Sequence, residues 1–105
     1  MGAIKGVLKE ELENSLQMKK DYERELSKLP KGSLIKKNIK GHKYYYLVLR
    51  QKGKVKFIYK GKLSKEEVIK YEEIKKLKNK YRRSLSKVKK QIKFLRKSLR
   101  GKESV

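Results

Sequence analysis

The strongest constraint on the fold is a long stretch near the C-terminus that contains neither glycine nor proline. After Gly61 no glycine occurs until Gly101, and the single proline, Pro30, lies far upstream. Lys78 stands where an apolar residue is expected in an otherwise regular pattern with spacings of three and four, which is typical of a heptad seam. The apolar members of this seam are Tyr71, Ile74, Tyr81, Leu85, Val88, Ile92, Leu95 and Leu99. The pattern predicts one helix over residues 64–100, about 50 Å long.

The two predicted helices have clear boundaries. Ser64 is the expected N-cap of the long helix, Glu67 completes a capping box, and Leu63 and Val68 stand where a hydrophobic staple would close. Residues 101–105 are expected to fray. Leucines and one tyrosine at helical spacings predict a first helix over residues 1–29, which ends at Pro30 and the glycine that follows it.

Between the helices the apolar pattern changes to a period of two. This alternation predicts three short strands, and the residues between them have turn composition. The expected strands are 33–37, 43–51 and 54–60, with turns at 38–41 and 52–53. The predicted fold class is α+β: an N-terminal helix, a three-stranded antiparallel β-meander over 33–62, and a long basic C-terminal helix packed on the first helix. All 105 residues are expected to form a single domain.

The net charge of +22 is unevenly distributed along the chain. The first 29 residues carry equal numbers of basic and acidic side chains, so the entire excess lies after Pro30. Two stretches, 31–62 and 74–102, contain no acid at all. A solubilising surface normally mixes both signs, whereas this segregation is typical of a protein that binds phosphates. The alternative is a solvated lysine-rich surface in an organism with an AT-rich genome.

The composition excludes several classes of function. The chain has no cysteine and a single histidine, His42, which is expected in an exposed turn and not as a general base. We therefore expect no metal site, no cofactor and no catalytic residues, and hence no enzyme. No apolar stretch approaches the roughly 20 residues that cross a bilayer, and Trp is absent, so we expect a cytoplasmic protein that does not bind membranes.

Two surfaces are candidates for binding nucleic acid. In the sheet, Tyr45, Leu47 and Leu49 are expected to form the core face together with Val55, Phe57 and Tyr59. The open face would then combine aromatic rings, which stack on bases, with cations that bind phosphates. Its expected members are Tyr44, Tyr46, Arg50, Lys54, Lys56 and Lys60.

The second candidate surface is the acid-free part of the long helix. Like charges one turn apart weaken a helix unless a polyanion or the acids of the first helix offset them. The residues expected to contact phosphates are Arg82, Arg83, Lys89, Lys90, Lys93, Arg96 and Lys97. The long helix exceeds the first one in length, so part of its seam is expected either to project or to pair with a second copy, which predicts a possible homodimer.

The sheet segment carries a pattern of short motifs, which are Leu29-Pro30-Lys31-Gly32-Ser33-Leu34, Tyr44-Tyr45-Tyr46-Leu47, Arg50, Gly53-Lys54-Val55 and Tyr59-Lys60-Gly61-Lys62. With these motifs the segment resembles a small domain of unknown function found in bacterial, archaeal and mobile-element proteins. The resemblance covers about a third of the chain and implies a phage, plasmid or transposon setting, without a reaction or catalytic residues. Some members of that family carry a cysteine cluster between the first two strands, but this chain has none, so a zinc site is not implied.

These observations predict a small basic protein that binds nucleic acid through the phosphate backbone with low sequence specificity. DNA is favoured over RNA, because a narrow sheet with a long basic helix suits a duplex. One alternative is an inhibitor or accessory protein that docks on a host nucleoprotein machine, such as a CRISPR effector or its guide RNA. Another is a ribosome-associated protein, which would share this composition.

Overall fold

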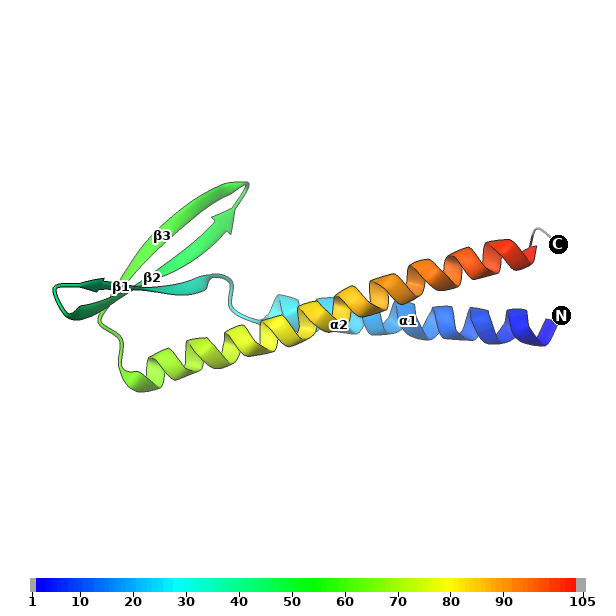
Figure 1. Ribbon diagram of the computed structural model, residues 1–105, viewed down its shortest axis with the longest axis horizontal. Coiled ribbons are helices and arrows are strands. Elements are labelled where there is room, and N and C mark those ends of the chain that lie inside the picture. The colour runs from blue at the N-terminus through cyan, green and yellow to red at the C-terminus, as the bar shows by residue number, and fades with distance from the viewer. Residues whose placement is uncertain (1, 104–105) are drawn as a thin grey trace. The chain divides into compact units, whose positions relative to one another are not determined.

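The computed structural model describes residues 2–103 and has the predicted α+β architecture (Figure 1). Along the chain, an N-terminal helix is followed by a three-stranded antiparallel sheet with strand order β1-β2-β3 and then by a long C-terminal helix. The elements are α1 (Gly2–Lys28), β1 (Ser33–Ile39), β2 (His42–Gln51), β3 (Lys54–Gly61) and α2 (Lys65–Glu103). The fold class predicted from the sequence is therefore confirmed, including the packing of the long helix on the first one.

Several element boundaries differ from the prediction. β1 is two residues longer than expected, because Asn38 and Ile39 pair with Lys43 and His42 instead of forming a turn. His42 is thus the first residue of β2 and not a turn residue. At the other end of the chain α2 continues past Arg100 to Glu103, so the first part of the expected frayed tail is helical. Residues 104–105 of that tail lie outside the described residues.

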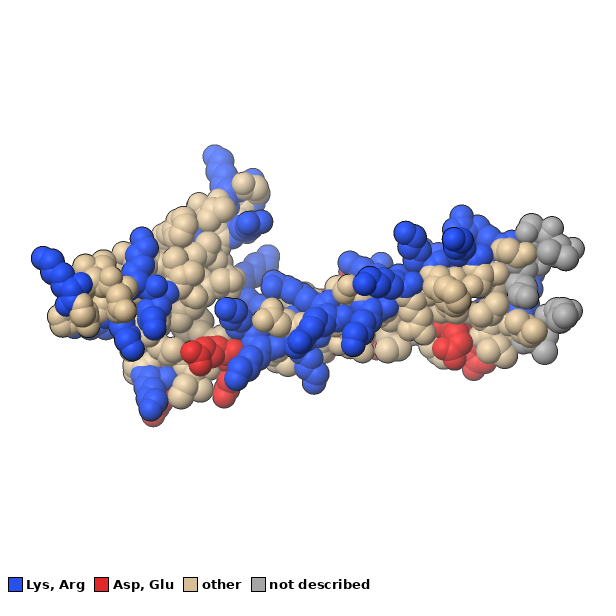
Figure 2. Space-filling model, viewed as in Figure 1, with Lys and Arg blue, Asp and Glu red and all other residues tan. Residues whose placement is uncertain are grey.

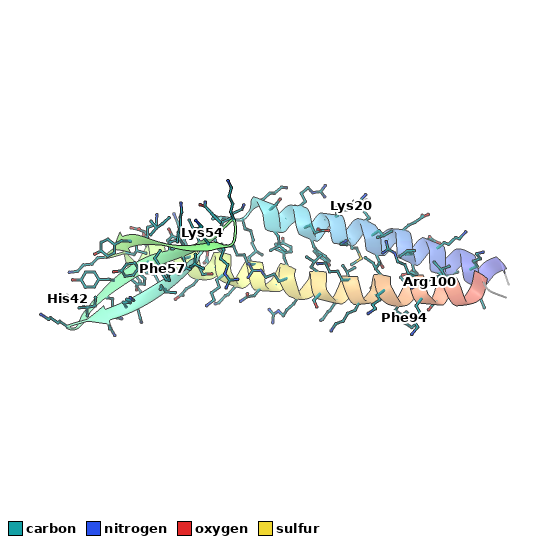
Figure 3. All side chains as sticks on the ribbon, turned by 90° about the horizontal axis from the view of Figure 1, so that it is seen from above. Lys20, His42, Lys54, Phe57, Phe94 and Arg100 are labelled. Carbon is teal, nitrogen blue, oxygen red and sulfur yellow. The ribbon has the colours of Figure 1, made fainter. Side chains whose placement is uncertain are left out.

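The chain divides into two compact units. We call α1 together with α2 from Asn79 onward the helical unit. Its core is the second half of the predicted seam, where the exposed fractions are only 3–8% for Val88, Ile92, Leu95 and Leu99. Ser15 of α1 is 1% exposed, and the two helices run side by side in both ribbon views (Figures 1 and 3). Burial of one stripe on each helix makes this unit a helical hairpin.

Residues Leu29–Lys78 form the second compact unit, which we call the sheet unit. Both of its hairpins turn through two residues with positive φ, Lys40-Gly41 (50° and 80°) and Lys52-Gly53 (50° and 76°). These values are those of type I′ turns, whose twist matches that of the strands. None of the described side chains in this unit is buried, and the best-covered ones are only half-buried.

The start of α2 carries the predicted N-cap. The Ser64 hydroxyl accepts a hydrogen bond from the Glu67 backbone N–H at 3.2 Å and donates one to Glu67 Oε1 at 3.1 Å. The Glu67 carboxylate therefore binds the serine side chain and not the serine backbone N–H of a standard capping box. The cap satisfies a helix N–H that would otherwise lack a partner.

Lys78, the polar break in the predicted seam, binds the loop before β1. Its ammonium group donates a hydrogen bond to the Gly32 carbonyl at 3.1 Å, in a partly buried position. Gly32 has φ +106°, and a Cβ there would lie 2.8 Å from Leu49 Cδ2 and 3.0 Å from Leu47 Cδ1. Only glycine fits this site without a shift of the leucines. The loop before β1 therefore lies against the face of the sheet that carries Leu47 and Leu49.

The strand register overturns one prediction about the two faces of the sheet. Tyr46 pairs with Tyr59, Val48 with Phe57 and Arg50 with Val55. Directly paired residues project from the same face, so Val55, Phe57 and Tyr59 do not share the face of Leu47 and Leu49 as expected. The predicted grouping was wrong because it ignored the length of the turn: a two-residue loop at Lys52-Gly53 pairs Gln51 with Lys54 and so sets the pairs as far as Tyr46 and Tyr59.

Candidate nucleic-acid interface

The helical unit carries a shallow groove lined almost entirely by cations, which we call the basic groove. It has a volume of about 330 Å³ and combines one side chain of α1 with five of α2. None of the described residues that line it is acidic. The lining consists of Lys19, Lys89, Ile92, Lys93, Arg96 and Arg100. Three predicted phosphate-binding residues, Lys89, Lys93 and Arg96, are thus brought together beside a lysine that lies far away in the sequence.

The remaining predicted cations of α2 form two other groups. Arg82 and Arg83 line a second hollow of about 410 Å³ together with Asn79 and Ser86, at spacings that place all four on one face of the helix. Lys90 and Lys97 are exposed and lie one turn on either side of Phe94, whose exposed fraction is 66%. Figure 3 shows Phe94 on the side of α2 that faces away from α1. The predicted residues of the helix therefore share its polar side, away from the buried seam, but they are divided among these three groups and do not line one common groove.

Three acids of α1, namely Asp21, Glu23 and Glu25, pair with cations of their own helix. Asp21 accepts hydrogen bonds from Arg24 at 2.6 Å and from Gln17 at 3.0 Å. Glu25 pairs with Lys28 at 3.3 Å, and Glu23 lies 4.0 Å from Lys19. These are exposed pairs at helical spacings, each of which contributes little to stability. Residues 74–102 of α2 contain no acid of their own, and Figure 2 shows blue side chains of Lys and Arg along the helices.

One face of the sheet is rich in aromatic side chains, and we call it the aromatic face. Its rings belong to Tyr44, Tyr46, Phe57 and Tyr59, and Phe57 and Tyr59 are 63% and 59% exposed. The Tyr59 ring centroid lies 5.2 Å from that of Tyr46 and 6.4 Å from that of Tyr44, in tilted arrangements. Phe57 projects from β3 in Figure 3. Such exposure of large apolar groups on a charged chain makes this face a candidate interaction surface.

Cations accompany these rings, but they are not all the predicted ones. Arg50 belongs to the aromatic face, and Lys37 Nζ lies 5.3 Å from the centroid of the Tyr46 ring, within cation–π distance. Lys54 and Lys56 project from the other face, because they pair with Gln51 and Leu49. Lys60 is the extra residue of a β-bulge, since Tyr46 pairs with Tyr59 while Tyr45 pairs with Gly61. The predicted group of three β2 residues and three lysines is therefore divided between faces.

Some site residues escaped the sequence analysis. Lys19 and Arg100 line the basic groove, but only the packing of α1 on α2 reveals this. Lys37 and Phe57 belong to the aromatic face, and the predicted two-residue turn contained the signal that would have placed Phe57 there. Within the described residues, no group of three or more His, Cys, Asp or Glu side chains lies close enough to hold a metal ion.

Comparisons with known proteins identify a family. A model described as a domain of unknown function, DUF6788, matches residues 8–70, which include most of α1, the whole sheet and the start of α2. No curated protein matches the chain, and neither does any solved structure. Among the described helices, none combines the length and the apolar character required to span a bilayer.

Proposed function

The chain belongs to the DUF6788 family, whose description assigns no activity, and from its own surface we propose that it is a non-catalytic nucleic-acid-binding protein. Binding rests on contacts to the phosphate backbone, has low sequence specificity and favours DNA. The proposed setting is the cytoplasm, and the resemblance of the sheet segment to domains of mobile elements supports a phage or plasmid origin.

The observation that carries this proposal is the basic groove. Lys89, Lys93 and Arg96 lie on one flank of α2, and Lys19 and Arg100 complete the same lining. A concave surface of like charges concentrates its potential and attracts an elongated polyanion. Ammonium and guanidinium groups are the phosphate ligands that proteins use most, and neutralising phosphates releases condensed counterions. The groove therefore suits a phosphate backbone better than a single small anion.

The cost of this arrangement to the protein also supports a polyanionic partner. Lys89 and Lys93 are separated by one helical turn, as are Lys93 and Lys97. Each such like-charge pair destabilises a helix by roughly 0.2–0.5 kcal/mol at low salt. A bound phosphate backbone removes this repulsion, so binding and helix stability reinforce each other.

Fluorescence anisotropy with labelled 20-nucleotide polymers tests the proposal. We expect tight binding at ~50 mM salt and a loss of roughly 10³–10⁵ in affinity by ~200 mM, as for six to ten phosphate contacts. A variant with Lys89→Gln, Lys93→Gln and Arg96→Gln is expected to lower the slope of log K against log salt by about three, one for each lost contact.

A matched variant separates the groove from overall charge. Lys9→Gln, Lys20→Gln and Lys28→Gln remove the same charge from α1, outside the groove, and are expected to leave most of the salt slope in place. If both triple variants lose affinity equally, general charge and not the groove accounts for binding. Micromolar or weaker affinity for every polymer at ~150 mM salt overturns the proposed function.

Phe94 favours a second candidate, docking on a nucleoprotein complex. Its ring is 66% exposed between Lys90 and Lys97, so one helix face offers an apolar anchor with flanking cations. Interfaces of proteins commonly centre on such an aromatic anchor. This candidate predicts that Phe94→Ala leaves binding to naked nucleic acid unchanged but weakens association with a purified target complex, such as a CRISPR effector loaded with guide RNA.

A further inference from the structure

We propose that the aromatic face of the sheet binds unpaired bases, so that the ligand of this protein is nucleic acid with a single-stranded segment. The inference rests on the proposed function and names its substrate class. It is carried by the observed register, which places four aromatic rings and two cations on one face of the sheet, and by the high exposure of two of these rings, Phe57 and Tyr59.

Two rings of the aromatic face, Phe57 and Tyr59, are more than half exposed, and no two rings of this face stack in parallel. Tyr46 and Tyr59 meet at an interplanar angle of 55°, and Tyr44 and Tyr59 at 35°, so neither pair is stacked in parallel. Phe57 pairs with Val48, which has no ring to cover it, and Phe57 is 63% exposed. Bases of any sequence stack on such ring surfaces, because every base has a π-face.

Cations on the same face of the sheet would contact the phosphates that link the bases. Lys37 is anchored over the Tyr46 ring, and Arg50 lies at the other end of β2 beside Val55. Rings in the centre with cations on both sides match a strand whose bases turn toward the protein and whose backbone passes over the flanking charges. Paired bases in a duplex are already stacked on their neighbours and do not offer their faces in this way.

Charge identifies the occupant as nucleic acid and not a second copy of this chain. The sheet and its turns contain no acidic residue between 31 and 62, so two aromatic faces brought together would place Lys37 and Arg50 of each copy against like charges. Such repulsion opposes self-association, whereas a phosphate backbone supplies the missing negative charge.

The test compares two substitutions of the same kind at sites of similar exposure. Phe57→Leu removes a ring from the aromatic face at 63% exposure, and Phe94→Leu removes one from α2 at 66% exposure. Both keep an apolar side chain, and circular dichroism verifies the fold. We expect Phe57→Leu to weaken binding of oligo-dT or oligo-U by about tenfold, in the range of one base–aromatic stack, and to leave duplex binding unchanged. Phe94→Leu is expected to change neither.

The intensity of tyrosine fluorescence reports contact of bases with the rings and is not changed by phosphate contacts alone. The chain contains seven tyrosines and no tryptophan, so ring stacking is observed directly as quenching. We expect quenching by oligo-dT and oligo-U but not by duplex DNA at equal occupancy, and Tyr59→Leu reduces it. The two oligomers distinguish DNA from RNA as the source of the unpaired bases.

The outcomes separate this inference from the proposed function. Equal binding of single strand and duplex, or a Phe57→Leu variant that binds single strands like the wild type, overturns the stacking surface. The basic groove then still accounts for salt-dependent binding. Absence of binding to every polymer overturns both proposals.

Discussion

The two units of this protein use apolar side chains in opposite ways. In the helical unit the seam residues Val88, Ile92, Leu95 and Leu99 are 3–8% exposed, so the apolar surface of α2 is used for folding. In the sheet unit no described side chain is buried, and the rings of Phe57 and Tyr59 are more than half exposed. A side chain that does not stabilise the fold is available for a ligand. The comparison therefore assigns stability to the buried seam of the helical unit, and in our proposal the exposed rings of the sheet unit contact bases while the basic groove contacts phosphates.

The basic residues follow the same division. In the helical unit they occupy the polar flanks of two packed helices, so the basic groove is an array of exposed charges on a scaffold held by the buried seam. In the sheet unit they surround rings on a small sheet with little core. A sheet of three strands is near the lower limit of independent stability. Ligand binding is thus expected to order the sheet unit more than the helical one.

The largest effect that tests this comparison is a cavity in the helical core. Ile92 is 6% exposed, and Ile92→Ala is expected to lower the free energy of unfolding by about 2–5 kcal/mol, through lost burial and the cavity left behind. Ile69 lies on the same helix within the sheet unit and is 43% exposed. Ile69→Ala is expected to change the free energy of unfolding by less than about 0.5 kcal/mol. Urea denaturation measures both. Equal losses would contradict the assignment of stability to the seam.

Periodicity predicted the elements of this fold because each one obeys a local rule. The spacing of three and four residues between apolar side chains from Leu85 to Leu99 fits a helix and not a strand. Ser64 together with Glu67 marks where that helix begins. The faces of the sheet depend on pairing between strands. A prediction that neglects the two-residue turn at Lys52-Gly53 assigns Phe57 to the wrong face, although the turn length was present in the sequence.

The candidate site was less predictable than the fold for a physical reason. Charge segregation located the cations along the chain, but a groove is a property of two packed helices. Lys19 lines the same groove as Lys93 and Arg96 because of the offset between α1 and α2. No local sequence pattern predicts that offset. The role of Lys78 was hidden for the same reason, since its hydrogen-bond partner Gly32 is distant in sequence.

An intermediate effect is expected at Gly32, where the sheet unit can be weakened by itself. Because φ is +106° and a Cβ at this position would lie within 3.0 Å of two leucine side chains, Gly32→Ala is expected to cost about 1–3 kcal/mol. The loss should appear in hydrogen exchange as faster exchange of the β2 amides, while amides around Val88 and Ile92 keep their protection. Uniform loss of protection across both units would show that they unfold together.

The smallest effect is a gain, and it tests whether turn strain limits the sheet. Lys40 and Lys52 both adopt φ 50°, a left-handed conformation that lysine rarely takes. Asn-Gly is the preferred dipeptide of a type I′ turn, so Lys40→Asn is expected to stabilise the sheet unit by a few tenths of a kcal/mol up to about 1 kcal/mol.

Lys40→Gln removes the same charge without favouring the turn and is the matched control. If both substitutions raise the midpoint of thermal unfolding equally, relief of charge repulsion and not backbone strain limits this hairpin. A gain confined to Lys40→Asn would show that the weakness of the sheet unit lies partly in its turns, since its exposed rings contribute little to folding in either variant.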